Sequence, residues 1–167
     1  MILAFDTWYF DNKAKTVGIV FGNWTAPVID KYYADVYEPI EEYVPGEFYR
    51  RELPCIMSLL QKMDVKEVEA IVIDGFVYLD DEGRYGLGGH LYQQVGEKIP
   101  VIGVAKNDFV TIQKNKRALL RGGSRRPLYI TAIGIDLGEA TDHIKSMAGT
   151  FRIPTLLKEL DRLTRQV

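Results

Sequence analysis

The amino-acid sequence predicts an α/β domain in which a mixed β-sheet is flanked by helices. Near the N-terminus, three apolar segments are separated by short turns, a pattern typical of an antiparallel meander. Farther along, short apolar runs alternate with segments whose apolar residues recur at helical spacing, which favours parallel strands joined by helices. The 167 residues suffice for one domain with a sizeable core. Because no repeat, low-complexity tract or linker divides them, we expect a single domain over residues 1–167.

The meander comes first. Two clusters of turn-forming residues, around Asn12 and around Asn23, separate its three strands. The acidic stretch 37–45 that follows is expected to be a loop. The strands are expected at residues 2–6, 16–21 and 26–36.

Helices and strands alternate after the meander. Pro54 lies within the first expected helix and is compatible with it only near a first turn or at a kink. Several glycines between residues 83 and 89 indicate a loop, and Pro154 suits the first turn of the last helix. Helices are expected at 46–63, from about His90, at 137–148 and after Pro154. Strands are expected at 68–74, 101–105 and 128–133.

Composition and charge limit the classes of function. The net charge is -2 and the sequence pI about 5.7, so a nucleic-acid partner would need locally concentrated positive charge. Cys55 is the single cysteine, which excludes an internal disulfide and favours a buried thiol. Asp6 interrupts the apolar start, which argues against a signal peptide. No apolar run approaches the ~18 residues of a membrane span. We expect a cytoplasmic protein with no membrane partner.

Three carboxylates fall where the pattern predicts burial. Asp6 and Asp74 each follow a short apolar run that predicts a buried strand. Glu52 shares a helical face with Ile56 and Leu59. Taken singly, each is better explained as an acid at a strand end or on a helix surface. Taken together they would repel one another in a core, and a hard cation such as Mg²⁺ would relieve that repulsion.

Positive charge is concentrated after the strand 101–105. Lys106 ends this strand, and the segment 107–126 carries six further cations, among them Arg121, Arg125 and Arg126. We expect Lys106 and these arginines to contact phosphates, although a charge run is often only a solvated surface. The glycines at 122 and 123 indicate a mobile loop that becomes ordered on binding. For His90, a phosphate contact and a polar helix cap are equally compatible with the sequence.

Several motifs follow one another in order between residues 6 and 106. They read Asp-Thr-Trp-Tyr from residue 6, Tyr-Val-Pro-Gly from 43, Arg-Glu-Leu-Pro from 51, Ile-Asp-Gly from 73, Gly-Leu-Gly-Gly-His from 86 and Ile-Pro-Val-Ile-Gly-Val-Ala-Lys from 99. In order and spacing they resemble motifs of the endonuclease V family, which are Asp-Val-Ser-Tyr, Tyr-Ile-Pro-Gly, Phe-Arg-Glu-Ile-Pro, Val-Asp-Gly, Gly-Leu-Ala-Ser-His and Leu-Pro-Thr-Ile-Gly-Val-Ala-Lys. A weaker echo lies at residues 151–154.

The resemblance implies a ribonuclease H-like fold and a metal-dependent endonuclease acting on DNA or RNA that contains inosine. Cleavage would fall at the second phosphodiester bond on the 3′ side of inosine, leaving 3′-hydroxyl and 5′-phosphate ends. By position, the ligands of Mg²⁺, with Mn²⁺ as an alternative ion, would be Asp6, Glu52 and Asp74.

The resemblance also implies how the altered base is recognised. Tyr43, Pro45 and Gly46 would belong to a wedge that inserts between bases where the altered base is turned out. The pocket for hypoxanthine would be formed at Gly46, Phe48, Gly75 and Leu87. Without the resemblance, the wedge segment would be a plain loop with a buried tyrosine. Gly75 is also compatible with a simple tight turn.

The sequence departs from the family at two histidines. Asp80 stands where the family has a histidine six residues beyond the second aspartate, and the later Ser-Pro-Gly-His element corresponds to residues 131–135, which lack histidine. These departures leave two alternatives open. One is a weakly active or non-catalytic nucleic-acid-binding member, and the other is an RNA-directed or structure-specific nuclease on the same fold. The sequence leaves open the choice of DNA or RNA and the oligomeric state.

Overall fold

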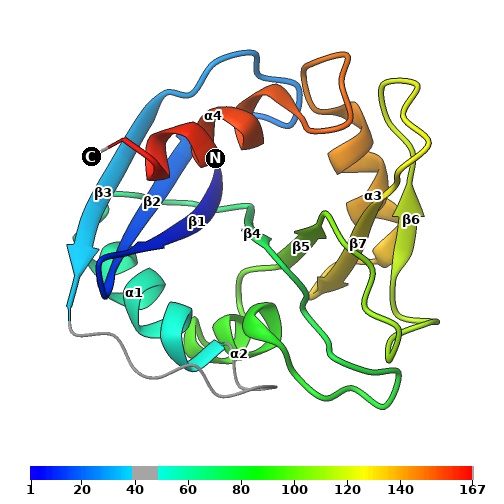
Figure 1. Cartoon of the computed structure of the whole chain (residues 1–167), viewed down its shortest axis with the longest axis horizontal. Coiled ribbons are helices and arrows are strands. Elements are labelled where there is room, and N and C mark those ends of the chain that lie inside the picture. Colours follow the sequence, from blue (N-terminus) through cyan, green and yellow to red (C-terminus); the bar gives the residue numbers. More distant parts are fainter. Residues whose placement is uncertain (39–48, 167) are drawn as a thin grey trace.

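The computed structural model describes residues 1–38 and 49–166, and in these residues a seven-stranded mixed sheet is covered by helices on both faces (Figure 1). The strand order is β3-β2-β1-β4-β5-β7-β6. The strands are β1 Ile2–Phe10, β2 Lys13–Phe21, β3 Lys31–Tyr37, β4 Ala70–Asp74, β5 Val101–Ala105, β6 Arg117–Leu119 and β7 Leu128–Ile133. The helices are α1 Tyr49–Lys62, α2 Leu87–Gln94, α3 Leu137–Ser146 and α4 Thr155–Thr164. The predicted mixed sheet with flanking helices is confirmed.

The predicted meander is formed by β1, β2 and β3, which pair antiparallel in sequence order. Asp11 and Asn12 turn the chain between β1 and β2 with φ of 46° and 58°, as a two-residue hairpin requires. Strand β1 continues to Phe10, so Asp6 lies within the strand and not at its end. The third strand begins at Lys31, later than the predicted residue 26, because residues 22–30 form turns.

The centre of the sheet is parallel. Strand β4 pairs parallel with β1 on one side and with β5 on the other, and both β4 and β5 are short and largely buried. Strand β7 pairs antiparallel with β5, and β6 extends the sheet beyond β7. Strand β6 was not predicted. Its side chain at Leu119 is buried while Arg117 and Ala118 are exposed, so it lacks the apolar run that marked the other strands.

Alternate side chains of the central strands face two separate cores. One core contains Ala4, Val72 and Val104 and is covered by α3 and α4, whereas the other contains Leu3 and Ile73 and is covered by α1 and α2. Figure 1 shows α4 across the sheet from α1 and α2. The residues next in register after Ala4, Val72 and Val104 on the α4 side are two aspartates and a lysine, which form the site described below.

The helices largely match the sequence pattern. The described part of the helix predicted at 46–63 forms α1, with Pro54 inside it. Helix α3 begins after Asp136, whose carboxylate accepts a hydrogen bond from the amide of Glu139 at 3.0 Å, a standard N-terminal cap. Pro154 immediately precedes α4, in agreement with the prediction. No helix of the described residues has both the length and the apolar character to cross a bilayer.

Candidate functional site

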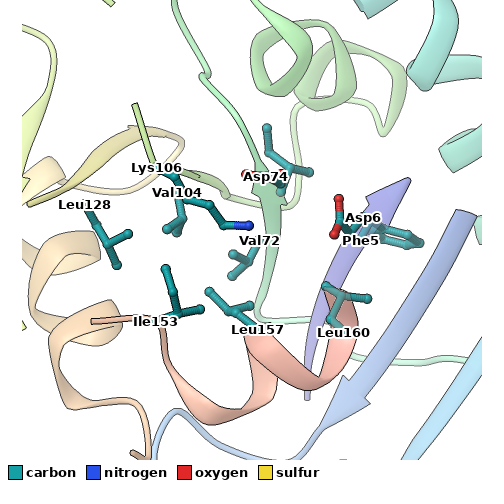
Figure 2. A pocket seen from close by; sticks show the side chains of 11 residues that line it. Phe5, Asp6, Val72, Asp74, Val104, Lys106, Leu128, Ile153, Leu157 and Leu160 are labelled. Atoms are coloured by element: carbon teal, nitrogen blue, oxygen red, sulfur yellow. The ribbon is translucent and has the colours of Figure 1, made fainter. Parts of the chain in front are cut away.

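Asp6, Asp74 and Lys106 line one pocket beneath helix α4 (Figure 2). Each comes from a neighbouring strand: Asp6 from β1, Asp74 from the end of β4, and Lys106 from the residue after β5. Apolar side chains form the remaining wall of the pocket, and they are Phe5, Val72, Ile73, Val104, Leu128, Ile153, Leu157 and Leu160. In Figure 2 the amine of Lys106 extends into this pocket, on the side where the carboxylate of Asp6 also lies.

The parallel register explains why these residues meet. Phe5 is paired with Ile73, so the next residues along the two strands, Asp6 and Asp74, are neighbours. Asp74 is paired with Val104, and Lys106 follows two residues later on the same face of the sheet. The prediction that Asp6 and Asp74 come from adjacent parallel strands is therefore confirmed.

The electrostatics of Asp6 reflect a crowded acidic site. Burial is the largest cause that raises its pKa to about 7, and the charges of Asp74 and Asp161 raise it further. A hydrogen bond from the amide of Thr7 to Oδ1 at 2.9 Å and the charge of Lys106 act in the opposite direction. For Asp74, desolvation likewise raises the pKa most, while Lys106 lowers it. Both carboxyls are therefore harder to ionise than ordinary aspartates.

Glu52 reaches the same acidic cluster from the other side of the sheet. Its side chain belongs to α1 and is only 5% exposed. Burial raises its pKa well above the usual range, and the charges of Asp6 and Asp74 raise it further. Its Oε2 atom is buried without a hydrogen-bond partner. A buried, unpartnered carboxylate oxygen is costly, so this atom needs a proton or a cation.

A fourth carboxylate, Asp161, was not identified from the sequence. It lies on α4, and its charge raises the pKa of both Asp6 and Asp74. Arg165 pairs with it at 3.4 Å. Leu157, four residues earlier on the same helix, lines the pocket of Figure 2. In the sequence nothing separates Asp161 from the other charged residues of this helix, and only the packing of α4 against the sheet reveals its place.

The carboxylate oxygens of this cluster are suitable ligands for a hard cation, although the side chains lie too far apart to coordinate one together. Carboxylate oxygens are preferred ligands of Mg²⁺, and the unpartnered Glu52 oxygen is available to accept it. Across residues 1–38 and 49–166, however, no three His, Cys, Asp or Glu side chains are grouped closely enough to hold a metal ion. Electrostatic coupling acts over longer distances than coordination. Glu52 and the aspartates would have to rotate toward one another around an ion.

Of the predicted base-recognition residues, Tyr43, Pro45, Gly46 and Phe48 lie outside the described residues. Gly75 follows Asp74 with φ of 127°, a conformation that favours glycine, so the tight-turn interpretation applies to it. A side chain added at Gly75 would meet only Ile73, at 4.0 Å. Leu87 is buried in the core beneath α1 and α2.

His90 is held between two tyrosines. Its ring stacks on Tyr49 at a centroid distance of 3.7 Å and meets the ring of Tyr85 edge-on. Burial lowers the pKa of His90, which favours the neutral imidazole. No side chain caps α2, so the predicted alternative of a polar cap is wrong.

The basic segment 107–126 is better anchored than the sequence suggested. The carboxylate of Asp81 accepts hydrogen bonds from the amides of Gln113, Lys114 and Asn115. Gly122 packs so closely that a Cβ there would lie 2.5 Å from the carbonyl oxygen of Thr150. These contacts attach the segment to the rest of the domain at residues 113–115 and at Gly122, while the expected ordering of the loop on binding stays a prediction.

The arginines of this segment have different environments. Arg125 and Arg126 are exposed, as a phosphate contact requires. Arg121 is only 7% exposed, and its guanidinium donates to the carbonyl oxygens of Phe151, Arg152, Met147 and Gly149. Its predicted phosphate contact is therefore corrected to a structural role, since the donors that would bind a phosphate are already used.

Asp80, which stands in place of the family's histidine, stabilises a turn. Its Oδ1 atom accepts hydrogen bonds from the amides of Glu82 and Arg84, both at 3.0 Å. A carboxylate engaged in this way shapes the loop between β4 and α2.

Comparisons with known proteins agree with this architecture. The sequence model of the family described as Endonuclease V matches residues 1–162. No curated protein sequence matches the chain.

Among solved structures, endonuclease V from Streptomyces avermitilis is 23% identical with a TM-score of 0.76, covering 98% of this chain and 79% of that one. Human ENDOV is also 23% identical, with a TM-score of 0.74 over 98% of this chain and 82% of the human chain. Ciona intestinalis endonuclease V, in complex with a 24mer DNA containing an inosine followed by a ribo-adenosine, is 18% identical. Its TM-score is 0.81 over 98% of this chain and 84% of that one.

Proposed function

Because this chain belongs to the endonuclease V family, we propose that it is a metal-dependent endonuclease that cleaves nucleic acid near inosine. The observation that carries the proposal is the coupled set of carboxylates Asp6, Glu52 and Asp74, which includes a buried oxygen without a partner. A structural role alone would not favour three mutually repelling acids at one edge of a sheet. A site that cleaves phosphodiester bonds would favour such a set of acids, because they could together hold a metal ion.

The proposed cofactor is Mg²⁺, with Mn²⁺ as an alternative, held by Asp6, Glu52 and Asp74. When bound, such an ion supplies positive charge for the scissile phosphate and lowers the pKa of a coordinated water. Asp161 adds a further negative charge to the same cluster. Lys106 already lowers the pKa of Asp6 and Asp74, and its amine is available for a phosphate oxygen at this edge.

The proposed substrate is DNA or RNA that contains inosine, cut at the second phosphodiester bond on its 3′ side. Support comes from the Ciona intestinalis relative, whose structure holds inosine-containing DNA. The wedge at Tyr43, Pro45 and Gly46 and the pocket residues Phe48, Gly75 and Leu87 are proposed to recognise the base. The exposed Arg125 and Arg126 are proposed to contact the phosphate backbone, which carries no sequence information.

A second candidate, a binding protein with little or no cleavage activity, is favoured by one observation. The later histidine of the family, in the Ser-Pro-Gly-His element, has no counterpart in residues 131–135. One turnover assay separates the two. Single and double strands of DNA and RNA, with and without inosine, are incubated with the protein in Mg²⁺, in Mn²⁺ and in EDTA.

We expect cleavage of the inosine-containing strands in either ion, none in EDTA, and none by the Asp74→Asn variant in any condition. Full activity of Asp74→Asn would contradict the metal site. Tight binding of inosine strands without turnover in either ion would instead support the binding protein.

A further inference from the structure

An exposed aromatic ring stands beside the carboxylate site. Phe151 lies shortly before α4 and is 71% exposed. It lines a surface groove along α4 together with Ile153, Lys158, Asp161, Arg162 and Arg165. Ile153 also lines the pocket of Figure 2, and Asp161 acts on the charges of Asp6 and Asp74. The groove therefore continues outward from the candidate active site.

A single exposed apolar side chain is common on protein surfaces. What distinguishes Phe151 is the backbone that carries it. The guanidinium of Arg121 donates to the carbonyl oxygen of Phe151 at 2.6 Å and to that of Arg152 at 3.3 Å. It also donates to the carbonyls of Met147 at 2.6 Å and Gly149 at 3.2 Å. Charge-assisted hydrogen bonds of this kind are among the stronger ones in proteins, so the segment 147–152 is fixed in place.

A second arginine fixes the same segment to the active edge. Arg152 donates from Nη2 to the carbonyl oxygen of Lys106 at 2.6 Å and to that of Pro127 at 2.9 Å. Its Nε donates to the carbonyl of Arg126, also at 2.9 Å. The exposed ring of Phe151 is thus bracketed by two arginines that are bonded to backbone carbonyls. A backbone that is already fixed loses little entropy when a ligand binds to the side chain that it carries.

A lysine and two ion pairs lie near the ring of Phe151. The amine of Lys158 lies over the Phe151 ring, 6.0 Å from its centroid, so a base would stack on the opposite face of the ring. In the groove, Arg162 pairs with Glu159 and Arg165 with Asp161. No carboxylate of the described residues forms an ion pair with Lys158. An exposed aromatic ring on an anchored backbone, beside a cation that forms no ion pair with the described residues, matches the two parts of a nucleotide, its base and its phosphate.

We propose that Phe151 is a stacking platform for an unpaired base of the substrate strand, with Lys158 contacting a phosphate next to that base. The proposal rests on the proposed function, because it takes the groove along α4 as the path of the strand that leaves the active site. The occupant is single-stranded nucleic acid, since bases within a duplex stack on one another and expose no face to a protein ring. Arg121 and Arg152 act as positioning residues for the ring.

The experiment separates binding from cleavage by using the Asp74→Asn background. Fluorescent single strands carry 2-aminopurine at one position each, and both affinity and the change in fluorescence are measured. We expect Phe151→Ala to weaken binding by roughly five- to a hundredfold, and Phe151→Trp to retain it. The fluorescence change should be lost at one position of the strand and preserved at the others. Val28→Ala, which shortens another exposed apolar side chain outside the groove, is the matched control.

Salt dependence tests the cation separately. Lys158→Ala should reduce the slope of log affinity against log salt by about 0.7, the value for one phosphate contact on a single strand. Equal binding by Phe151→Ala and Val28→Ala would overturn the proposal, as would a fluorescence profile that does not change. Absence of any single-strand binding would also overturn it.

Failure of the stacking platform and failure of the proposed function give different results in these experiments. If the wild-type protein cleaves inosine strands but Phe151→Ala binds normally, the platform is wrong and the proposed function stands. If the wild-type protein never cleaves but the platform variants lose binding, the groove binds single strands and the proposed function is wrong.

Discussion

Replacing Asp6 by asparagine should stabilise the metal-free protein, and the gain should grow with pH. In the folded protein the pKa of Asp6 is raised from 3.8 to about 7. Below the lower value the carboxyl is protonated in both the folded and unfolded states, so no penalty applies. Above the higher value it is ionised in both, and the folded state bears the full cost. The free energy of unfolding contributed by Asp6 therefore falls between about pH 4 and pH 7.

The magnitude follows from the size of this displacement. About three pH units at about 1.4 kcal/mol each set an upper limit of about 4 kcal/mol. Part of that cost arises from burial, and a buried asparagine also loses contact with water. About half, near 2 kcal/mol, is a reasonable expectation for the gain. For a protein of this size, such a gain raises Tm by about 4–8 °C. Asparagine retains the oxygen that accepts the hydrogen bond from the amide of Thr7.

Thermal melts of wild type and Asp6→Asn in EDTA, at pH 5, 6.5 and 8, measure this difference. Comparing the two proteins at each pH cancels the titration of groups that are not coupled to Asp6, whereas Asp74 and Glu52 contribute to the difference as members of the same cluster. Adding Mg²⁺ at pH 8 should raise the Tm of the wild type more than that of the variant, because the ion relieves repulsion among the acids. A gain that is equal at pH 5 and pH 8, or a loss at pH 8, would refute the assignment of Asp6 to a repulsive acidic cluster.

Three further outcomes are expected. Arg121→Met leaves four buried or half-buried carbonyls without their donor and should lower the free energy of unfolding by about 3–5 kcal/mol. Urea denaturation measures this loss. As a control, Arg125→Met at an exposed arginine should change the free energy of unfolding by less than about 0.5 kcal/mol. The double variant Arg125→Ala and Arg126→Ala should weaken binding to strands with and without inosine by similar factors. It should also reduce the slope of log affinity against log salt concentration. An unchanged slope in salt titrations would exclude phosphate contacts by these residues. Tyr43→Ala should weaken binding to inosine-containing duplex roughly five- to a hundredfold and to single strands less, and equal losses on both would assign Tyr43 a purely structural role.

Local pattern was sufficient for much of the fold. Strands β5 and β7 have the bounds predicted from their apolar runs, because continuous runs of buried residues have few other solutions. Strand β6 could not be predicted, since it is short and its identity depends on pairing with β7. The late start of β3 has a local cause, because residues 22–30 form turns and bends, and the side chain of Asn23 accepts two hydrogen bonds from Thr25 in the first of them.

The site was predictable only in part, because several of its features depend on contacts between distant segments. Asp6 and Asp74 were found because each follows an apolar run. Arg121 looked like other members of a basic run, and its burial depends on carbonyls about 30 residues away, from Met147 to Arg152. Asp161 carried no distinctive sequence signal, since α4 is rich in exposed charges. Its role appears only when α4 is packed over β1.

The arrangement of the acids on two faces of the sheet is a further reason to propose a bound cation at this site. Asp6 and Asp74 face α4, whereas Glu52 belongs to α1 on the opposite face. Lys106 lowers the pKa of Asp6 and Asp74 only in part, since both remain raised, and it is not among the causes that shift the pKa of Glu52. Arg51 lowers the pKa of Glu52, yet Oε2 remains unpartnered. The proposed Mg²⁺ ion would offset the repulsion among all three acids, which neither Lys106 nor Arg51 does.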